Sequence, residues 1–361
     1  MDKKTLAAIA AAILISASFT PEASACTGIT LHSADSCTVF ARTIEWGGSS
    51  LNSGYVLVPR GHVQQSMLPG GKPGGMTFTA KYGYVGLTVE QKEFVTEGLN
   101  EAGLSAGLFY FPGYGSYAEY DPADDARTIA DFQLVSWLLS SFATVDEVRN
   151  AIDGVTIVGI DPRSSTVHWR VGDKAGNEIV IEIVDGKAGI HDNTVGVLTN
   201  SPGFEWQATN LNNYVNLRPG TSPQGRMGDV ATSSFGAGSA FLGLPGDVTP
   251  PSRFVRAAFY KATAPQRPTA WETVKEAFHI LNNFDIPIGA EHADGSIPDD
   301  LPSATQWTTC TDVVGGKIYY RTAWNSTIRC LDISRVNFSK AAYTYAPLDK
   351  EQEEQMVRVK L

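Results

Sequence analysis

The chain has 361 residues, of which 43% are hydrophobic and 18% are charged, and its formal net charge is −10. This length suffices for one large domain or two ordinary ones with a buried core, and the composition excludes a disordered or collagen-like protein. The negative charge would repel phosphate groups, so nucleic acid and anionic membranes are poor candidate partners. Four cysteines without a CxxC pair exclude a disulfide-dense scaffold, a zinc ribbon and a thioredoxin-type motif.

Residues 1–25 have the pattern of a secretory signal peptide. Lys3 and Lys4 give a positively charged start, residues 6–19 form an apolar stretch, and a small-residue cleavage site ends at Ala25. The apolar stretch is too short to span a bilayer comfortably, and no later segment approaches the roughly 20 apolar residues of a transmembrane helix. We therefore expect a periplasmic or secreted protein, in a compartment that permits disulfides.

Cleavage after Ala25 would make Cys26 the first residue of the mature chain. The N-terminus alone leaves three interpretations open: coincidence, a lipoprotein whose cysteine carries lipid, and an N-terminal nucleophile. Ala23 is a poor match to a lipoprotein signal, which usually has a larger aliphatic residue at that position. A free α-amine has an unperturbed pKa of about 7.7–8.0, so it can act as a base for the adjacent thiol near neutral pH.

The first third of the chain is predicted to consist mainly of strands. Alternating apolar residues and turn signals place strands at residues 26–31, 37–42, 55–58, 94–99 and 104–111. The glycine-rich run 69–75 is interpreted as a surface turn. It is a poor phosphate-binding loop, because Pro73 follows Lys72 and no helix begins there.

Helices and further strands follow. Helical periodicity over residues 129–142 predicts one amphipathic helix, and Thr144 with Glu147 has the capping-box spacing that begins another. Residues 218–252 are rich in Gly, Pro and Ser with isolated apolar residues, which favours a loop packed on the surface. The remaining elements are strands at 165–171, 178–184, 194–199, 305–313, 317–322 and 327–333, and helices near 253–262 and 270–283. This order predicts an α+β fold, with two antiparallel sheets and helices on their outer faces.

Several common catalytic sites lack support. The six histidines include neither an HExxH motif nor an i,i+4 pair, so neither a zinc site nor a cofactor is expected. His168 and His279 fall in strand and helix patterns and are interpreted as structural. No G-x-S-x-G motif is present, which disfavours a serine hydrolase of the elbow type. A papain-like enzyme needs a cysteine that opens a helix, whereas Cys26 opens a predicted strand.

Cys26 and Arg42 are expected at neighbouring ends of the first hairpin, where the guanidinium would lower the pKa of the thiol. With its surroundings, this pair resembles the choloylglycine hydrolase family, which contains penicillin V acylases and conjugated bile salt hydrolases. The resemblance rests on motifs in the same order along the chain: CTG at 26–28, FARTIEW at 40–46, NEAGL at 100–104, LTNSPGFEW at 198–206 and LPGDVTPPSRF at 244–254.

The resemblance implies a single N-terminal nucleophile hydrolase domain over residues 26–361, with four αββα layers, that hydrolyses a linear amide C–N bond. Cys26 matches the nucleophile, with its own α-amine as the base. Arg42 matches the arginine near the thiol, and Arg253 matches a second active-site arginine. Asn200 matches an oxyanion-hole side chain.

Two further positions bear on activity and substrate. Tyr110 falls where the family's penicillin acylases carry tyrosine and its bile salt hydrolases usually carry asparagine, and its backbone N–H would complete the oxyanion hole. Glu45 departs from the family pattern, which has aspartate there. Its side chain is longer by one methylene, and a shift of that size at a nucleophile can cost rate or change substrate preference.

The leading hypothesis is an exported amidase resembling penicillin V acylase. Its alternatives are a conjugated bile salt hydrolase or N-acyl homoserine lactone acylase of the same family and, from another class, a lipid-anchored binding protein modified at Cys26. Family members are often homotetramers, and the apolar residues of the 218–252 loop suit an assembly role. Cys310 and Cys330 are predicted in neighbouring strands. The sequence is compatible both with a disulfide between them and with two buried free thiols.

Overall fold

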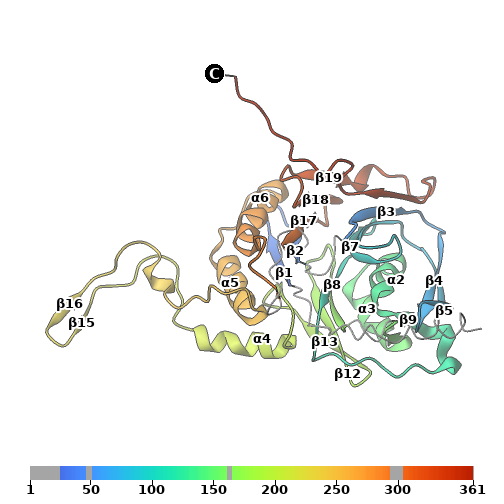
Figure 1. Ribbon diagram of the computed structural model, residues 1–361, viewed down its shortest axis with the longest axis horizontal. Helices are drawn as coiled ribbons and strands as arrows, with labels where there is room; N and C mark the ends of the chain where they lie inside the picture. The colour runs from blue at the N-terminus through green and yellow to red at the C-terminus, as the bar shows by residue number, and fades with distance from the viewer. Residues whose placement is uncertain (1–24, 46–50, 161–164, 293–303, 361) are drawn as a thin grey trace, which may run out of the picture.

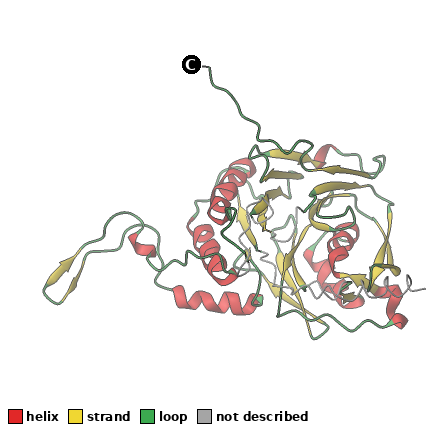
Figure 2. Cartoon of the chain, in the orientation of Figure 1, coloured by secondary structure: helices red, strands yellow, loops and turns green. Residues whose placement is uncertain are grey.

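Two antiparallel sheets lie face to face in the computed structural model, which describes residues 25–45, 51–160, 165–292 and 304–360 (Figures 1 and 2). In spatial order, the first sheet contains β14 (Val197–Leu198), β1 (Cys26–His32), β2 (Thr38–Glu45), β17 (Thr305–Asp312), β18 (Lys317–Thr322) and β19 (Arg329–Asp332). The second contains β13 (Lys187–Asp192), β12 (Glu178–Val184), β11 (Val167–Gly172), β8 (Ser105–Tyr110), β7 (Val95–Asn100), β6 (Tyr84–Thr88), β3 (Gly54–Val58) and β20 (Thr344–Pro347).

Helices cover the outer face of each sheet. Helices α5 (Pro250–Thr263) and α6 (Ala270–Leu281) pack against β1 of the first sheet, and α6 also contacts β2 and β17. Helix α2 (Leu134–Ser141) packs on β7 and β8 of the second sheet, and α3 (Val145–Ala151) contributes to the same apolar core. The four layers predicted from the sequence are therefore present, in the order helix, sheet, sheet, helix.

The second sheet has two chemically different faces. Along β12, Ile179, Ile181 and Ile183 belong to the apolar core shared with α2. The alternate residues Glu178 and Glu182 are also buried, and they lie on the face turned toward the first sheet. Because side chains along a strand alternate between the two faces, one strand supplies both an apolar and a charged layer.

Several sequence predictions are confirmed residue by residue. The Thr144 hydroxyl accepts a hydrogen bond from the Glu147 backbone N–H and caps α3, as the capping-box spacing predicts. Strands β12 and β18 have the predicted bounds. The hairpin of β7 and β8 lies where it was expected, and so do helices α5 and α6 to within a few residues.

Other predictions are corrected. The helix expected over 129–142 begins only at Leu134, because Thr128–Ala130 forms strand β9 and pairs in parallel with β10 (Thr156–Val158). Strands β4 (Val63–Leu68) and β5 (Lys72–Thr79) form a hairpin. The run 69–75 contains the turn between these strands and the first residues of β5. Strand β13 was not expected, and the predicted strand 194–199 shrinks to β14.

The 218–252 segment extends away from the two sheets rather than packing on them (Figure 1). Strands β15 (Gly225–Met227) and β16 (Val230–Thr232) form a small hairpin at its tip. Apolar side chains of this segment are left in solvent, among them Met227, Val230, Phe235 and Leu242. An apolar surface of this kind on a projecting arm is typical of a contact region for another molecule.

Cys310 and Cys330 do not lie in neighbouring strands. Cys310 pairs with Tyr319, and Tyr319 pairs in turn with Cys330, so β18 separates the two cysteines. Two strand spacings amount to roughly 9–10 Å, which exceeds the reach of a disulfide. All four cysteines are free thiols, with Cys330 exposed and the other three buried.

The predicted signal peptide lies outside the described residues except for Ala25, which is buried and still joined to Cys26. Over the described ranges, no helix has the length and apolar character needed to cross a membrane.

Candidate active site

Cys26 opens β1, an inner strand of the first sheet, and only 4% of its surface is exposed. Within the β1–β2 hairpin, Cys26 lies opposite Ile44, and Gly28 lies opposite Arg42. Directly paired residues point to the same face of a sheet, so the Cys26 and Arg42 side chains share the face turned toward the second sheet. Gly28 leaves the space for this arrangement, because a Cβ there would lie 2.8 Å from the Phe109 ring.

Asn200 joins Cys26 to the second sheet. The backbone N–H of Cys26 donates to Asn200 Oδ1 at 3.0 Å, and Asn200 Nδ2 donates to the Tyr110 carbonyl at 2.8 Å. Asn200 follows β14, which pairs with β1, and Tyr110 ends β8 in the opposite sheet. One buried amide therefore contacts both the candidate nucleophile and the strand expected to supply an oxyanion donor.

Arg253 extends from α5 and donates hydrogen bonds to Cys26, Thr27 and Asn200. Its Nη1 donates to the Cys26 carbonyl and, at 2.9 Å, to Thr27 Oγ1. Its Nη2 donates to Asn200 Oδ1 at 2.6 Å. The guanidinium is buried, and its planar fork lets it position Cys26 and Asn200 at once.

Arg42 approaches from β2 and lies between the two sheets. Its Nη1 donates to the Leu108 carbonyl at 2.5 Å, and its guanidinium lies 4.0 Å from the centre of the Phe109 ring. Its Nε lies 3.5 Å from Glu97 Oε2. Arg42 thus brings a positive charge to the inner face of the sheet without a direct hydrogen bond to Cys26.

Glu45 lies at the end of β2, where its backbone N–H donates to the Ala25 carbonyl at 2.8 Å. Its carboxyl accepts a hydrogen bond from Thr305 Oγ1 at 2.9 Å. Burial raises the pKa of Glu45 to about 8, although the charge of Arg253 acts in the opposite direction. Burial therefore opposes ionisation of this carboxyl more strongly than in an exposed glutamate.

Burial also raises the pKa of the Cys26 thiol, while Arg42 and Arg253 act to lower it and Glu45 acts to raise it. A backbone hydrogen bond with Tyr110 lowers it as well. The peptide bond to Ala25 makes the Cys26 nitrogen an amide, which is not basic. In this form the thiol keeps its proton, and a base at the Cys26 nitrogen requires that this peptide bond be cut.

The structure brings all six residues singled out from the sequence to the start of β1. Cys26, Asn200, Tyr110 and Arg253 form one hydrogen-bonded group, and Arg42 and Glu45 flank it on β2. Sequence reasoning missed Thr27 and Thr305. Thr27 adjoins Cys26 in the CTG motif, but Thr305 carries no local signal, because only the pairing of β2 with β17 brings it to Glu45.

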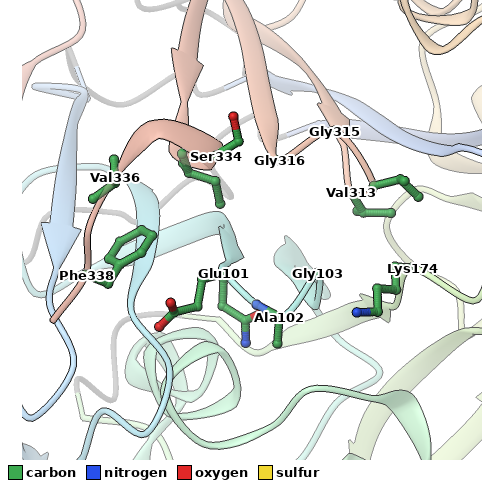
Figure 3. A pocket seen from close by; sticks show the side chains of 13 residues that line it. Glu101, Ala102, Gly103, Lys174, Val313, Gly315, Gly316, Ser334, Val336 and Phe338 are labelled. Atoms are coloured by element: carbon green, nitrogen blue, oxygen red, sulfur yellow. The ribbon is translucent and has the colours of Figure 1, made fainter.

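A cavity of about 290 Å³ lies at the opposite end of β8 and β17, between the β7–β8 and β17–β18 turns (Figure 3). The side chains around it include Lys174, Ser334 and Phe338, and none of the six candidate residues lines it. Within the described parts of the chain, no cluster of three or more His, Cys, Asp or Glu side chains is arranged to hold a metal ion.

Known proteins are similar to this chain in sequence and architecture. Residues 26–352 match the family model of linear amide C–N hydrolases, choloylglycine hydrolase family. A bile salt hydrolase/transferase of Clostridium perfringens is 33% identical over 86% of this chain and 93% of its own. A penicillin V acylase of Pectobacterium atrosepticum is 26% identical over 86% of this chain and 81% of its own.

The architecture is likewise that of N-terminal nucleophile hydrolases. The crystal structure of a variant of conjugated bile acid hydrolase from Clostridium perfringens superposes with a TM-score of 0.78 and is 29% identical. The match covers 92% of this chain and 100% of the other. The fold class predicted from the sequence is therefore confirmed.

Proposed function

Because the chain belongs to the choloylglycine hydrolase family of linear amide C–N hydrolases, we propose that it is an exported amidase whose nucleophile is the thiol of Cys26. One observation carries this proposal. The nitrogen of Cys26 is held by Asn200 and its carbonyl by Arg253, in a buried position at the start of an inner strand. Such fixation matters for a nucleophile, because about 1 Å of misplacement can cost a hundredfold in rate.

The proposed reaction uses the mature chain that begins at Cys26. The free α-amine takes the thiol proton, and the thiolate attacks the amide carbonyl carbon of the substrate. The amine then leaves with a proton from the Cys26 ammonium, and the acyl group remains on sulfur as a thioester. Water hydrolyses the thioester, again with the α-amine as base, and releases the acid and the thiol.

The negative charge on the carbonyl oxygen needs fixed donors. The Asn200 amide has two N–H groups, so it can keep its bond to the Tyr110 carbonyl and offer the second to the oxyanion. The backbone N–H of Tyr110 lies at the thiol and is the second proposed donor. Loss of one such donor typically costs about 10²–10³-fold in kcat.

The proposed substrate is an acyl amide of the penicillin V type. Tyr110 supports this choice, because the penicillin acylases that the chain resembles carry tyrosine at the corresponding position. A conjugated bile salt is the second candidate, favoured by the higher identity to the Clostridium perfringens enzyme than to the penicillin V acylase. N-acyl homoserine lactones are a third class of acyl amide within the same chemistry.

A substrate panel tests the proposal. Purified protein is assayed with penicillin V, glycine- and taurine-conjugated bile salts and N-acyl homoserine lactones, and kcat/KM is compared across them. Cys26→Ser should lower activity at least about a thousandfold with an unchanged circular dichroism spectrum, because serine is a far weaker nucleophile here. Cys330→Ser, at an exposed cysteine, is the matched control and should keep full activity. Absence of turnover with every substrate would refute the amidase proposal.

Export and the identity of the first residue are proposed together, since the α-amine exists only after cleavage at Ala25. Intact mass of the exported protein distinguishes the possibilities. An unmodified chain that begins at Cys26 supports the amidase. A mass increment of a diacylglycerol on Cys26 would instead support the lipid-anchored binding protein.

Assembly into a homotetramer is proposed through the projecting 218–252 segment. Its support is the exposure of apolar side chains such as Phe235 and Leu242 on an arm outside the two-sheet body. Light scattering coupled to size exclusion should give four chains for the wild type and fewer for Phe235→Ser/Leu242→Ser. A wild type that remains monomeric would contradict the assembly proposal.

A further inference from the structure

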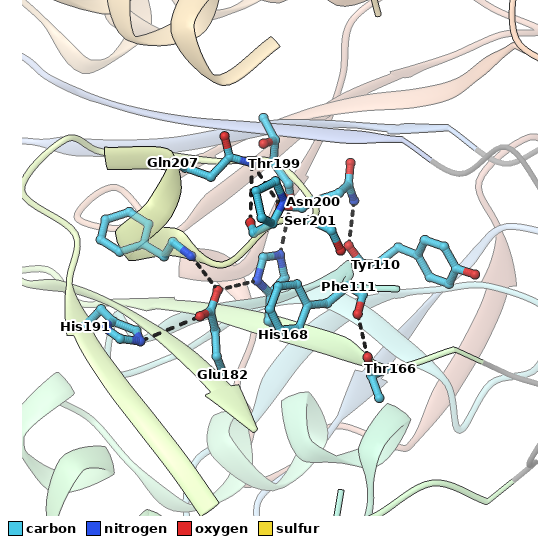
Figure 4. A network of polar contacts seen from close by, with 12 residues as sticks. Tyr110, Phe111, Thr166, His168, Glu182, His191, Thr199, Asn200, Ser201 and Gln207 are labelled. Carbon is cyan, nitrogen blue, oxygen red and sulfur yellow. Dashed lines mark hydrogen bonds and ion pairs between the residues drawn. The ribbon is translucent and has the colours of Figure 1, made fainter. Parts of the chain in front are cut away.

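His168 lies in β11, on the inner face of the second sheet, and is completely buried (Figure 4). Its Nδ1 lies 3.0 Å from Glu182 Oε1, and its Nε2 lies 3.1 Å from the backbone carbonyl of Thr199. Thr199 immediately precedes Asn200. The histidine therefore contacts the backbone segment that carries the amide bound to Cys26.

The hydrogen-bond partners of the ring determine which of its nitrogens donates to the Thr199 segment. A carbonyl oxygen can only accept a hydrogen bond, so His168 Nε2 must carry a proton. Glu182 Oε1 also accepts the Phe204 backbone N–H at 2.8 Å, as an ionised carboxylate does. Burial by itself would raise the pKa of Glu182, but the hydrogen bond and charge of His168 hold it below its usual value. His168 therefore lies between Glu182, on its Nδ1 side, and the Thr199 carbonyl, to which its Nε2 donates.

Two further contacts tie the same ring to the Tyr110 side of the site. Phe111 follows Tyr110 and stacks on His168, with ring centres 4.4 Å apart and planes 7° apart. Farther along both segments, the Ser201 hydroxyl donates to the Pro112 carbonyl at 2.6 Å. Both neighbours of Asn200 are therefore linked to the segment that follows Tyr110: Thr199 through the His168 ring, and Ser201 through its hydrogen bond to Pro112.

We infer that His168, paired with Glu182, is a positioning residue that fixes Asn200 against Cys26 and Tyr110. This inference rests on the proposed function, in which Asn200 donates to the oxyanion. His168 does not touch the reacting atoms. It anchors the Thr199 carbonyl, and this anchor sets the backbone from which the Asn200 side chain extends.

Removal of His168 alone would take from the buried Glu182 carboxylate its nearest side-chain partner and leave it His191 at 3.6 Å, which could destabilise the protein for an unrelated reason. The test therefore compares two variants that both lack this charge. In Glu182→Gln, a neutral His168 still donates from Nε2 to Thr199 and accepts at Nδ1 from the glutamine amide. In His168→Phe/Glu182→Gln, the flat ring can still stack on Phe111, and the donor to Thr199 is gone.

Loss of the donor to Thr199 should lower kcat and leave KM nearly unchanged. We expect Glu182→Gln to stay within about threefold of the wild type, because the positioning bond survives. We expect His168→Phe/Glu182→Gln to lose about 10- to 100-fold in kcat, because the oxyanion donor is displaced while ground-state binding is kept. Its KM should stay within about twofold of the wild type.

A rescue variant separates positioning from packing. In His168→Gln/Glu182→Gln, the glutamine amide nitrogen occupies about the place of the imidazole Nε2 and restores a donor for Thr199. Part of the lost kcat should return, although the stacking on Phe111 is lost. His62→Gln is the matched control, since His62 also stacks on an aromatic ring, that of Tyr343, and should leave kcat unchanged.

Nitrogen NMR of histidine-labelled protein tests the donor to Thr199 without an assay. The wild type and Glu182→Gln should both show a proton on His168 Nε2. Wild-type kcat in His168→Phe/Glu182→Gln would overturn the inference, and so would an equal loss in Glu182→Gln or a change confined to KM. These outcomes require an active wild type, so they differ from failure of the amidase proposal, in which the wild type has no turnover.

Discussion

The two faces of the second sheet differ in chemistry. Toward α2, the sheet presents buried apolar side chains such as Trp169 and Ile181, packed with Leu138 of the helix. Toward the first sheet, the same strands present the charged residues Arg170 and Glu182 beside apolar ones such as Val180. Both faces are equally shielded from water, so exposure does not explain the difference.

The contrast indicates what each layer contributes. Burial of apolar surface stabilises a fold by about 25 cal/mol per Å² removed from water, and it positions no polar group for a reaction. Buried charges recover their desolvation cost only with partners in good geometry, and apolar replacements of similar volume are often as stable. Here the charges reach across the layer: Arg170 Nη1 donates to the carbonyls of Ile29 and Ala41, both at 3.2 Å. The charged layer fixes the strand that begins with Cys26, whereas the apolar layer holds the sheet to its helices.

Truncation in the apolar layer should give the largest loss of stability. Leu138→Ala leaves a cavity under α2 and should lower the free energy of unfolding by about 2–5 kcal/mol. Activity per folded molecule should not change, because Leu138 is remote from Cys26. Urea unfolding and active-site-normalised kcat measure the two effects. Val63→Ala, on an exposed valine, is the control and should change stability by less than about 0.5 kcal/mol. A loss of kcat in Leu138→Ala would show that the two layers are not independent.

Glu45 should make stability depend on pH. Its pKa is about 8 in the folded protein against an ordinary value of 4.5, so the folded state binds the proton more tightly than the unfolded state does. The stabilisation is fully present below the unfolded value and is lost as pH rises through the folded one. Between about pH 5 and pH 7, the unfolding free energy should fall by about 2–3 kcal/mol from this group.

Glu45→Gln is the test of that slope, because glutamine keeps the hydrogen bond with Thr305 and cannot ionise. Urea titrations at several pH values should give a flatter profile than the wild type. Identical slopes in the two proteins would show that Glu45 is already ionised at neutral pH.

A conservative change in the charged layer should give the smallest effect, and it should appear in activity. Arg42→Lys keeps the charge and loses the planar fork that reaches the Leu108 carbonyl, so kcat/KM should fall by about tenfold. The matched control is Arg60→Lys, which alters an exposed bidentate pair with Glu101 and should leave kcat/KM unchanged. Equal effects in the two variants would remove the distinction between Arg42 and a surface arginine.

Much of the site is predictable from the sequence, because its residues lie in local patterns or in motifs that resemble those of a known family. The position of Cys26 follows from the cleavage pattern, and Arg42 follows from hairpin geometry. Asn200, Tyr110 and Arg253 were singled out only through the resemblance to a family, because their contact depends on β8, β14 and α5 converging in space. The strand pattern around His168 predicts a structural role, and no sequence pattern shows that its ring reaches the Thr199 carbonyl.

These errors in the fold have one physical cause, which is strand pairing that local sequence patterns do not show. Residues 129 and 130 fall within the predicted helix, yet residues 128–130 form a strand that pairs with β10. Strand β13 is only half-buried and lacks the apolar alternation that marked β12, but its pairing with β12 makes it a strand. Local propensity is a weak preference that tertiary hydrogen bonding overrides.

By itself, the sequence determined the class of the protein: the α+β order of elements, the capped helix at Thr144, the candidate nucleophile and the family. These features depend on periodicity, caps and motifs, which involve residues close together along the chain. Only the tertiary structure decided the raised pKa of Glu45, the separation of Cys310 from Cys330 and the contact of His168 with the Asn200 segment. Each of these depends on burial or on distances between strands, which arise only when the two sheets pack face to face.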